Sequence, residues 1–391
     1  MKILAIETSC DETAVSVIEA RGDTKHSQFT ICGNNLLSQV ALHQEYGGVY
    51  PSLAKREHAK NLVPILEQTL KEAGLAKTQI AKINDNLKQE LQTLLTREPE
   101  LFERLIILLE KIGKPDFDSI AVTYGPGLEP ALWVGINFAK ALSLVWKIPL
   151  IPVNHMEGHI FSGLLNKKAD VVYEIKAVTF PVLALLISGG HTELVLMKEW
   201  GTYNIIGSTR DDAVGEAFDK VARLLSLLYP GGPEISRLAE KARQENITLN
   251  ESFPRPMLTS DNYDFSFSGL KTAVLYYIKD KTLGEELKQK IAREFEESAI
   301  EVLVHKSLRA IEEYGVQTFI TGGGVSANAY LRAELKEKTQ KYYPTLILHM
   351  PEQNLTTDNA IMIGIAGYFK TLLKKGVTSE EATAIGNLKL S

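Results

Sequence analysis

The sequence has few cysteines, no long apolar run and no excess of positive charge, and each absence excludes a class of protein. With only Cys10 and Cys32 among 391 residues, the chain lacks the disulfide framework that holds small secreted domains together. No uninterrupted apolar run reaches the ~18 residues of a membrane-spanning helix. The N-terminus meets Glu7 and Asp11 too early for the apolar region of a signal peptide. We therefore expect a cytoplasmic protein without membrane attachment.

Positive charge is scarce, because 43 lysines and arginines face 48 aspartates and glutamates, which gives a net charge of −5. A protein that binds nucleic acid through an overall positive field shows the opposite balance. Any contact with nucleic acid must therefore come from a local patch or a partner protein. The length predicts two domains, or one large split domain, at ~100–200 residues per domain.

The segment HMEGH, from His155 to His159, is the most specific short pattern in the chain. It follows the strand-like run PLIPV and opens a helix-like run. Histidines four residues apart lie on one face of an α-helix, where both can bind one metal ion. The alternative is a pair of unrelated histidines. Glu157 lies two residues from each histidine, whereas the zinc-peptidase pattern HExxH has its glutamate directly after the first histidine.

Two stretches about half a chain apart share the order apolar run, polar turn, apolar run. The first covers Ile3–Ile18, with its polar turn at Glu7–Thr13, and the second covers Pro181–Met197, with its turn at Ser188–Thr192. Such pairs of strands predict an internal duplication with a cleft between the halves. Residues 118–153 add a strand, a Gly/Pro turn, a helix and a strand, which is typical of a mixed or parallel sheet covered by helices.

Further candidate binding groups lie in turns. Gly322–Gly324 separates a strand from a helix, where backbone N–H groups suit a phosphate, and the loop YPGGP can approach a ligand closely. Asp358 stands at the start of a helix pattern, where an aspartate is usually an N-cap and can also be a ligand. Residues 76–114 predict an inserted helical hairpin without recognisable chemistry, since two apolar stripes flank Glu98-Pro99.

Eight motifs occur in a fixed order along the chain. They are IETSCDET, HMEGH, LISGGHTE, DDAVGEAFDK, YPGGP, FSFSGLKT, GGGVSAN and TDNA. In this order they closely resemble the tRNA N6-adenosine threonylcarbamoyltransferase family of the bacterial type. The resemblance covers nearly the whole chain except the insert at 76–114.

The resemblance implies an α/β fold with two duplicated actin/sugar-kinase-like (ASKHA) lobes, a nucleotide cleft between them, and the helical-hairpin insert as an addition. We expect residues 1–153 to form the first lobe, which carries the insert 76–114 and is completed by the C-terminal helix at 357–391. Residues 154–356 are expected to form the second lobe.

The resemblance also implies a reaction. In this family the threonylcarbamoyl group passes from threonylcarbamoyl-AMP to N6 of the adenosine 3′-adjacent to the anticodon, in tRNAs that read codons beginning with A. The histidines of HMEGH and the aspartate of TDNA bind one metal ion, generally Fe(2+); here these are His155, His159 and Asp358. Two histidines and a carboxylate leave open coordination positions, so the metal would orient and polarise the intermediate.

The family's other positions carry over motif by motif. Asp11 and Glu12 would face the same cleft and assist the attacking amine as catalytic groups. The glycines of LISGG would offer backbone N–H groups to phosphate, while Asp219 and Asn328 would hydrogen-bond the sugar and the base. The implied substrate-binding residues are Leu186, Ile187, Ser188, Gly189, Gly190, Asp219, Gly232 and Asn328.

The implied partners are tRNA, threonylcarbamoyl-AMP, a paralogous ASKHA subunit and a small P-loop-type ATPase. Asn154 departs from the family, where a third histidine often precedes HMEGH, but that position is not an implied metal ligand. Three alternatives stay open: a metallopeptidase, an ASKHA-type small-molecule kinase or ATPase, and a non-catalytic regulatory subunit. The missing HExxH pattern argues against the first, and the histidine pair argues against the other two.

Overall fold

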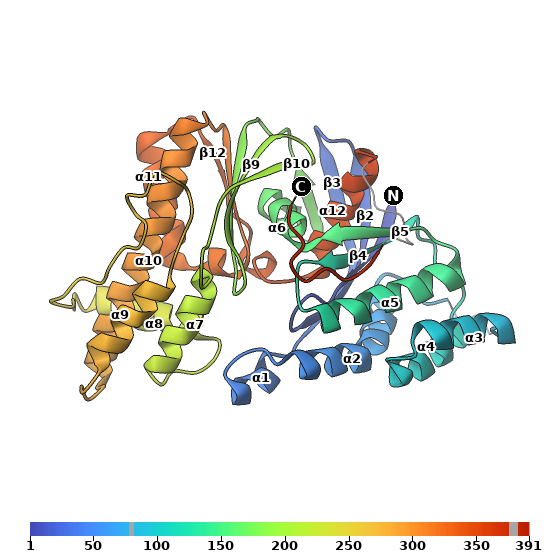
Figure 1. Cartoon of the computed structure of the whole chain (residues 1–391). Helices are drawn as coiled ribbons and strands as arrows, with labels where there is room; N and C mark the ends of the chain where they lie inside the picture. Colours follow the sequence, from blue (N-terminus) through green and yellow to red (C-terminus); the bar gives the residue numbers. More distant parts are fainter. Residues whose placement is uncertain (78–81, 375–381, 391) are drawn as a thin grey trace. The chain divides into compact units, whose positions relative to one another are not determined.

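The computed structural model describes residues 1–77, 82–374 and 382–390. They form two compact units, each built around one mixed β-sheet (Figure 1). Unit 1 consists of Met1–Leu42, Val49–Ala177 and Asp358–Leu390, and unit 2 of His43–Gly48 and Val178–Thr357. Unit 1 is therefore discontinuous in the sequence, since a C-terminal stretch completes it.

The sheet of unit 1 has the order β5-β4-β1-β2-β3-β7-β6. Strands β1, β4 and β5 run parallel to one another, whereas β2, β3, β7 and β6 pair antiparallel with their neighbours. The strands are β1 (Lys2–Glu7), β2 (Glu12–Gly22), β3 (Ser27–Ser38), β4 (Ser119–Gly125), β5 (Leu150–Asn154), β6 (Asn166–Ala169) and β7 (Val172–Ile175).

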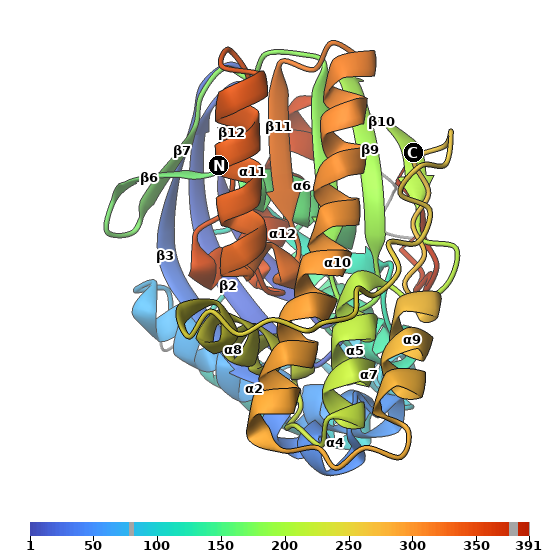
Figure 2. The same cartoon turned by 90° about the vertical axis from the view of Figure 1, so that its left-hand side faces the viewer.

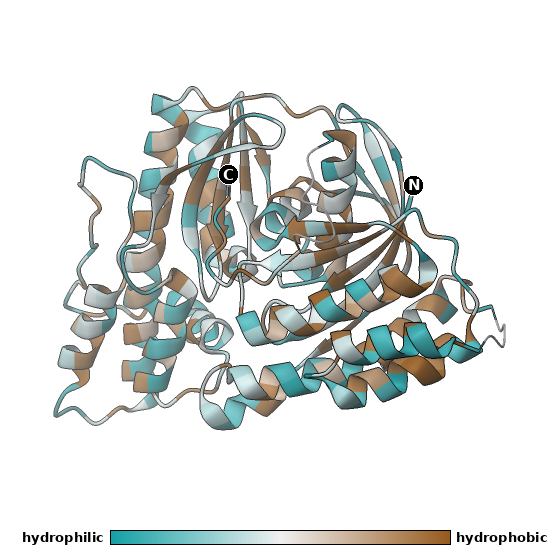
Figure 3. Ribbon diagram, turned by 45° about the vertical axis from the view of Figure 1, so that its right-hand side comes forward, coloured by the Kyte–Doolittle hydropathy of each residue, from teal (hydrophilic) through white to brown (hydrophobic). Residues whose placement is uncertain are grey.

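Helices cover both faces of the central strands of this sheet. Successive residues of a strand point to opposite faces; Leu4 and Ile6 share a hydrophobic cluster with α2 and α5, whereas Ala5 faces Gly364 of α12. The unbroken apolar run of β1 follows from this double burial, and Figure 3 shows the hydrophobic colour of these strands. The helices in this part of the chain are α1 (Val40–His43), η1 (Gln44–Tyr46), α2 (Pro51–Glu72), α3 (Asp85–Leu94), α4 (Pro99–Lys111), α5 (Glu129–Trp146), α6 (His155–Leu164) and α12 (Ala360–Leu372).

The sheet of unit 2 has the order β10-β9-β8-β11-β12. The long helix α10 contacts β8, and α11 lies beside α10 (Figure 2). The strands are β8 (Val182–Ile187), β9 (Thr192–Glu199), β10 (Thr202–Ser208), β11 (Thr318–Gly322) and β12 (Ile347–His349). The helices are α7 (Val214–Leu224), α8 (Gly231–Gln244), α9 (Ser268–Ile278), α10 (Glu285–Glu313), η2 (Gly324–Ala327), α11 (Ala329–Tyr342) and η3 (Gln353–Leu355).

The two sheets repeat one topology. In unit 1, β1 pairs antiparallel with β2 and parallel with β4; in unit 2, β8 pairs antiparallel with β9 and parallel with β11. A third antiparallel strand and a third parallel strand extend each sheet in the same way. The predicted α/β class and internal duplication are therefore confirmed, while the cleft expected between the halves stays a prediction.

The insert forms two helices, α3 and α4, which pack on unit 1. Helix α3 contacts α4 and α5, and α4 contacts α2. Their apolar stripes lie in the same hydrophobic cluster as Leu62 and Leu66 of α2. The predicted helical hairpin is therefore present, and its buried face extends the core of unit 1.

The expected boundary at residue 153 differs from this division of the chain. Helix α6 packs on α12, and β7 pairs with β3, so the stretch 154–177 belongs to unit 1. All three predicted metal ligands consequently lie in one unit. No helix among the described residues is both long enough and apolar enough to cross a membrane.

Candidate metal centre

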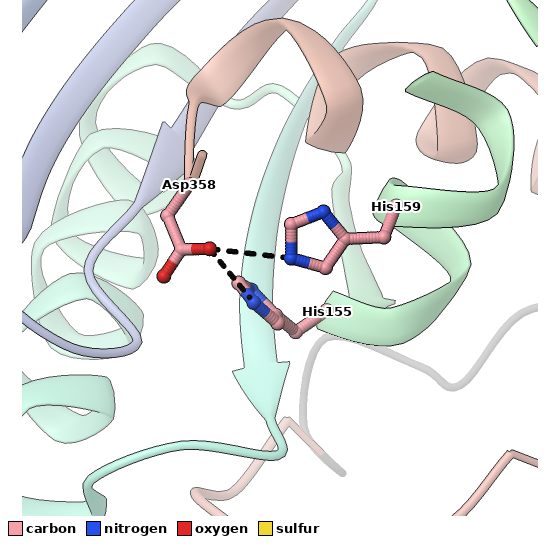
Figure 4. Close-up of side chains that lie close together, drawn as sticks. All are labelled: His155, His159 and Asp358. Atoms are coloured by element: carbon pink, nitrogen blue, oxygen red, sulfur yellow. Dashed lines mark ion pairs between the residues drawn. The ribbon is translucent and has the colours of Figure 1, made fainter. Parts of the chain in front are cut away.

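Three side chains from two distant parts of the chain meet in unit 1 (Figure 4). His155 and His159 lie on α6, and Asp358 directly precedes α12. The Nε2 atoms of both histidines are 3.2 Å from Oδ1 of Asp358. Candidate ligand atoms of the three residues all lie within 4.8 Å of one another. The structure thus brings the three predicted ligands around one position.

Two asparagine caps explain why both helices begin beside this position. The Oδ1 atom of Asn154 accepts a hydrogen bond from Met156 N at 2.8 Å, so α6 begins at His155. The Oδ1 atom of Asn359 accepts one from Met362 N at 3.0 Å and caps α12. Because Asn359 performs the capping, the carboxylate of Asp358 is left to face the histidines. The N-cap alternative for Asp358 is therefore wrong.

The donor set fits a metal ion. Both ring nitrogens of His159 are buried and have no hydrogen-bond partner among the described residues, although Nε2 faces Asp358. A buried polar atom without a partner costs ~1–3 kcal/mol, and a cation bound by Nε2 removes that cost. Two imidazoles and one carboxylate with open positions suit a divalent transition metal such as Fe(II).

Burial and neighbouring charges set the pKa values of these groups. Burial lowers the pKa of His155, but Asp358 and Glu7 raise it, and the net pKa lies well above the ordinary value. Burial lowers the pKa of His159. Burial raises the pKa of Asp358, but the charge and hydrogen bonds of the histidines bring it well below its usual range. Since a metal ligand must be a neutral imidazole, a cation held here would compete with a proton for His155.

One side chain of this site was not singled out as a contact by the sequence patterns. Glu7 ends β1, is fully buried, and has Oε2 at 3.1 Å from Nδ1 of His155. The same oxygen accepts a hydrogen bond from Thr123 Oγ1 at 2.6 Å, and Oε1 accepts one from Ser9 N at 2.5 Å. The signal in the sequence is an acidic residue at the end of the apolar strand ILAIE.

Asp11 and Glu12 lie in the same unit as the metal-site residues. Asp11 is buried, and Glu12 begins β2. Burial raises the pKa of Glu12 well above its usual range, and the charges of Asp358 and Asp11 raise it further. Glu12 thus interacts electrostatically with Asp358 of the site. The part of Asp11 and Glu12 in a reaction stays a prediction.

The first predicted substrate-binding residues lie in unit 2, at the carboxyl end of β8. Leu186 and Ile187 end this strand and are fully buried. Ser188 Oγ accepts a hydrogen bond from Gly190 N at 3.3 Å, which closes the turn. Gly189 and Gly190 have open space where a Cβ would stand. The turn therefore presents backbone that a ligand can approach.

Two other glycines bring further backbone against this turn. Gly323 follows β11 with a φ of 87°, and a Cβ there would lie 2.4 Å from the Ile187 carbonyl oxygen. A Cβ on Gly215 of α7 would lie 2.5 Å from the Ser188 carbonyl oxygen. The carboxyl ends of the parallel strands β8 and β11 and the start of α7 thus meet. In α/β sheets this edge is where ligands bind.

Asp219 lies on α7 and faces the start of α8, where Gly232 lies. Asp219 Oδ1 accepts a hydrogen bond from Gly231 N at 2.7 Å and fixes the first turn of this helix. Gly232, the next residue, has open space around its missing Cβ. One of the two predicted residues therefore supports the loop, and the other leaves it accessible.

Asn328 is engaged within unit 2. Its Nδ2 donates hydrogen bonds to Ser236 Oγ at 2.8 Å and to Glu296 Oε1 at 2.7 Å. Its Oδ1 accepts one from Leu331 N at 2.8 Å and caps α11. The side chain thus joins α8, α10 and α11, and its predicted contact with a base stays a prediction.

Comparisons with known proteins place these features in one family. The family model for tRNA N6-adenosine threonylcarbamoyltransferase matches residues 30–84 and 100–365. The chain is 41% identical over 381 residues to a protein of that name from Persephonella marina, covering 97% of this chain and 92% of the relative. It is 40% identical over 369 residues to one from Staphylococcus aureus strain MRSA252, covering 94% and 91%. The solved structure of T. kodakarensis HypF overlaps with a TM-score of 0.49 at 14% identity, covering 73% and 44%.

Proposed function

The chain belongs to the tRNA N6-adenosine threonylcarbamoyltransferase family, and from this premise we propose which of its residues serve the activity. Proteins of this family are transferases that modify an adenosine of tRNA, and this chain is one of them. We propose threonylcarbamoyl-AMP as the donor. The acceptor is N6 of the adenosine 3′-adjacent to the anticodon, in tRNAs that read codons beginning with A.

The observation that carries the proposal is the grouping of His155, His159 and Asp358 in a chain whose family match spans most of its length. We propose that these residues hold one divalent metal ion, Fe(2+), per subunit. When bound, such an ion supplies Lewis-acid polarisation and orientation of the donor. The protein's own part is to hold two neutral imidazoles and one carboxylate in place.

The glycine turn at the end of β8 is proposed to bind the adenylate. Gly189 and Gly190 have the open backbone that an approaching phosphate requires, and N–H groups of such turns favour anions. The full proposed set is Leu186, Ile187, Ser188, Gly189, Gly190, Asp219, Gly232 and Asn328. In this set Asp219 and Asn328 hydrogen-bond the sugar and base portions, and Asn328 does so in addition to its capping contacts.

Asp11 and Glu12 are proposed to assist the attacking amine. The raised pKa of Glu12 means that this carboxyl group holds its proton at a pH where an exposed glutamate has lost it. A carboxyl group within reach of a reacting nitrogen can move a proton to or from it. We assign acceptance of the amine proton to Asp11.

The partners are proposed from the family as well. They are tRNA, threonylcarbamoyl-AMP, a paralogous ASKHA subunit and a small P-loop-type ATPase. Because the substrate is tRNA, we place the activity in the cytoplasm. The net charge of −5 supports a partner or a local patch as the source of the positive field that tRNA requires.

The competing peptidase and kinase hypotheses are weaker. Glu157, the only glutamate of HMEGH, has Oε2 at 3.3 Å from Lys370 Nζ, and this ion pair occupies the carboxylate that a peptidase would use as its base. A small-molecule kinase has no use for two buried histidines that face an aspartate. Both alternatives predict products other than a modified adenosine.

Incubation of the protein and its partners with threonylcarbamoyl-AMP and unmodified tRNA, read by nucleoside mass spectrometry, tests the proposal. We expect the modified adenosine with the wild type and its loss in His155→Ala and His159→Ala, together with loss of bound metal by elemental analysis. The control Glu157→Gln should retain both. Full metal content in both alanine variants would overturn the assigned ligands, and an unmodified tRNA with the wild type would overturn the reaction.

A further inference from the structure

We infer that Glu7 is a positioning residue, which orients His155 as a metal ligand and strengthens cation binding by His155, His159 and Asp358. The inference rests on the metal centre proposed above. Glu7 itself does not face the proposed metal position: its Oε2 lies 3.1 Å from Nδ1 of His155, whereas Nε2 of the same ring faces Asp358.

The contact decides which ring nitrogen carries the proton. A carboxylate can only accept a hydrogen bond, so the Nδ1 atom that faces it must donate. With the proton on Nδ1, the lone pair of neutral His155 lies on Nε2, on the side of Asp358 and His159. Ser9 Oγ, at 3.2 Å from the same Nδ1, adds a second polar contact on that side of the ring. Glu7 thereby fixes both the tautomer and the direction of the ligand.

Glu7 is held rigidly enough to orient another side chain. Thr123 Oγ1 on the parallel neighbour β4 donates to its Oε2, and Ser9 N donates to its Oε1. The side chain is fully buried. Burial of a carboxylate is costly unless it is paired, and a neutral residue could serve a backbone N–H and a hydroxyl. The negative charge is therefore explained by His155 and by the cation beyond it.

The two histidines differ in this respect. His155 has a carboxylate behind its ring, whereas Nδ1 of His159 is buried without a hydrogen-bond partner. His159 thus contacts Asp358 through Nε2 at 3.2 Å, but it has no carboxylate at its second ring nitrogen. Loss of the Glu7 charge should therefore affect only one of the two histidine ligands, His155.

Glu157 offers a matched control. It lies on α6 between the two histidines, is buried, and carries the same carboxylate, but it pairs with Lys370 of α12 at 3.3 Å. Glu157→Gln makes the same chemical change as Glu7→Gln. It removes a charge close to the centre without touching the second nitrogen of a ligand.

The test is a titration of the metal-free full-length protein with Co²⁺, with competition by a chelator and the visible absorption spectrum as the readout. We expect Glu7→Gln to weaken Co²⁺ binding by about 10–100-fold, the usual effect of removing the acceptor behind a ligating histidine. Its absorption spectrum should also shift, because the ligand field changes. Glu157→Gln should match the wild type in both.

A second variant covers the case in which Glu7→Gln does not fold. Thr123→Val keeps the charge and removes the hydroxyl that holds Oε2, so we expect a smaller weakening in the same direction. Equal Co²⁺ affinity in the wild type and a folded Glu7→Gln, or in Thr123→Val when Glu7→Gln is unfolded, overturns the inference. Equal weakening in Glu157→Gln also overturns it. If the wild type binds no Co²⁺, the proposed centre itself fails, and the inference fails with it.

Discussion

Gly323 occupies a position in unit 2 where the structure leaves no room for a side chain. Its φ of 87° and the Ile187 carbonyl oxygen 2.4 Å from the position of a Cβ both exclude a side chain. We predict that Gly323→Ala destabilises the protein by at least about 1–3 kcal/mol, measured by denaturant unfolding. Gly324→Ala, where a Cβ meets open space, is the control and should change the unfolding free energy far less. Equal effects of both substitutions would contradict this packing.

Gly190 offers the opposite case, because its surroundings are open. Apart from its chain neighbours, no described atom lies within 4 Å of a Cβ at this position, so Gly190→Val should fold with wild-type thermal stability. It should nevertheless abolish binding of AMP in calorimetry, since the branched side chain stands where phosphate must approach the backbone. Unchanged affinity would show that the adenylate does not bind at this turn.

Lys306 is a buried amine whose charge is unfavourable in the folded state. Burial and Arg309 lower its pKa to about 8, from an ordinary 10.5, although Asp264 opposes the shift. Between these values the unfolded chain binds more protons than the folded one, so the unfolding free energy contributed by this residue rises with pH. We predict that wild type gains stability relative to Lys306→Met as the pH rises from about 8 to about 10.5. A pH-independent difference in denaturant unfolding would contradict the shift.

Residue chemistry was predictable where a motif names a side chain, and not where a contact comes from elsewhere in the chain. The motifs HMEGH and TDNA supplied the three side chains that the structure groups together, but the choice of Asn359 over Asp358 as the helix cap depends on the backbone. Asp211 shows the same limit. It lies in an acidic cluster of the sequence, yet its Oδ1 accepts from Phe267 N at 2.8 Å and helps to start α9. No local pattern joins positions 56 residues apart.

Among the elements, the helical insert is the one whose removal tests the layout of unit 1. The proposed ligands lie on α6 and next to α12, which pack together, while α4 packs on α2 over the other face of the sheet. We predict that replacing Ala76–Lys114 by a short Gly/Ser linker leaves a folded protein that binds Co²⁺. The protein should be less stable, because apolar surface of α2 becomes exposed. Thermal unfolding and Co²⁺ titration measure both effects.

A point substitution in α4 tests how much the insert contributes to stability without removing the insert. Leu105 of α4 is fully buried in the shared hydrophobic cluster, and Leu105→Ala should cost about 2–5 kcal/mol without altering Co²⁺ affinity.

If the insert serves a partner or tRNA, the deletion variant loses tRNA modification while it retains AMP binding. A metal-free deletion variant would show that the insert supports the centre.

Elements with a strong pattern were predicted well. The two predicted strand–turn–strand units correspond to β1–β2 and β8–β9, and α6 begins at HMEGH as predicted. The stretch after HMEGH was not predicted correctly, because nothing in the sequence of β7 tells that it pairs with β3 rather than with the following strands. Strand partners far apart in sequence are set by packing, and the boundary at residue 153 failed for this reason.

At the scale of the whole molecule, the repeated sheet order confirms what two similar stretches of sequence suggested. The order β3-β2-β1-β4-β5 recurs as β10-β9-β8-β11-β12. Yet the two units have diverged in chemistry: the paired histidines follow the last parallel strand of unit 1, whereas unit 2 carries glycine turns at the ends of β8 and β11. The two units thus share one sheet topology, and each carries a different group of predicted binding residues.

The discontinuity of unit 1 has a consequence for the nascent chain. A ribosome releases both histidines of α6, and then all of unit 2 up to Thr357, before Asp358 and α12 emerge. Until then the face of the unit 1 sheet that α12 covers is exposed to solvent. Asp358, the third proposed ligand, has not yet been synthesised. Since domains fold as they leave the ribosome, unit 2 can fold before unit 1. The proposed metal site with His155, His159 and Asp358 can therefore form only in a chain that has been translated beyond Asp358.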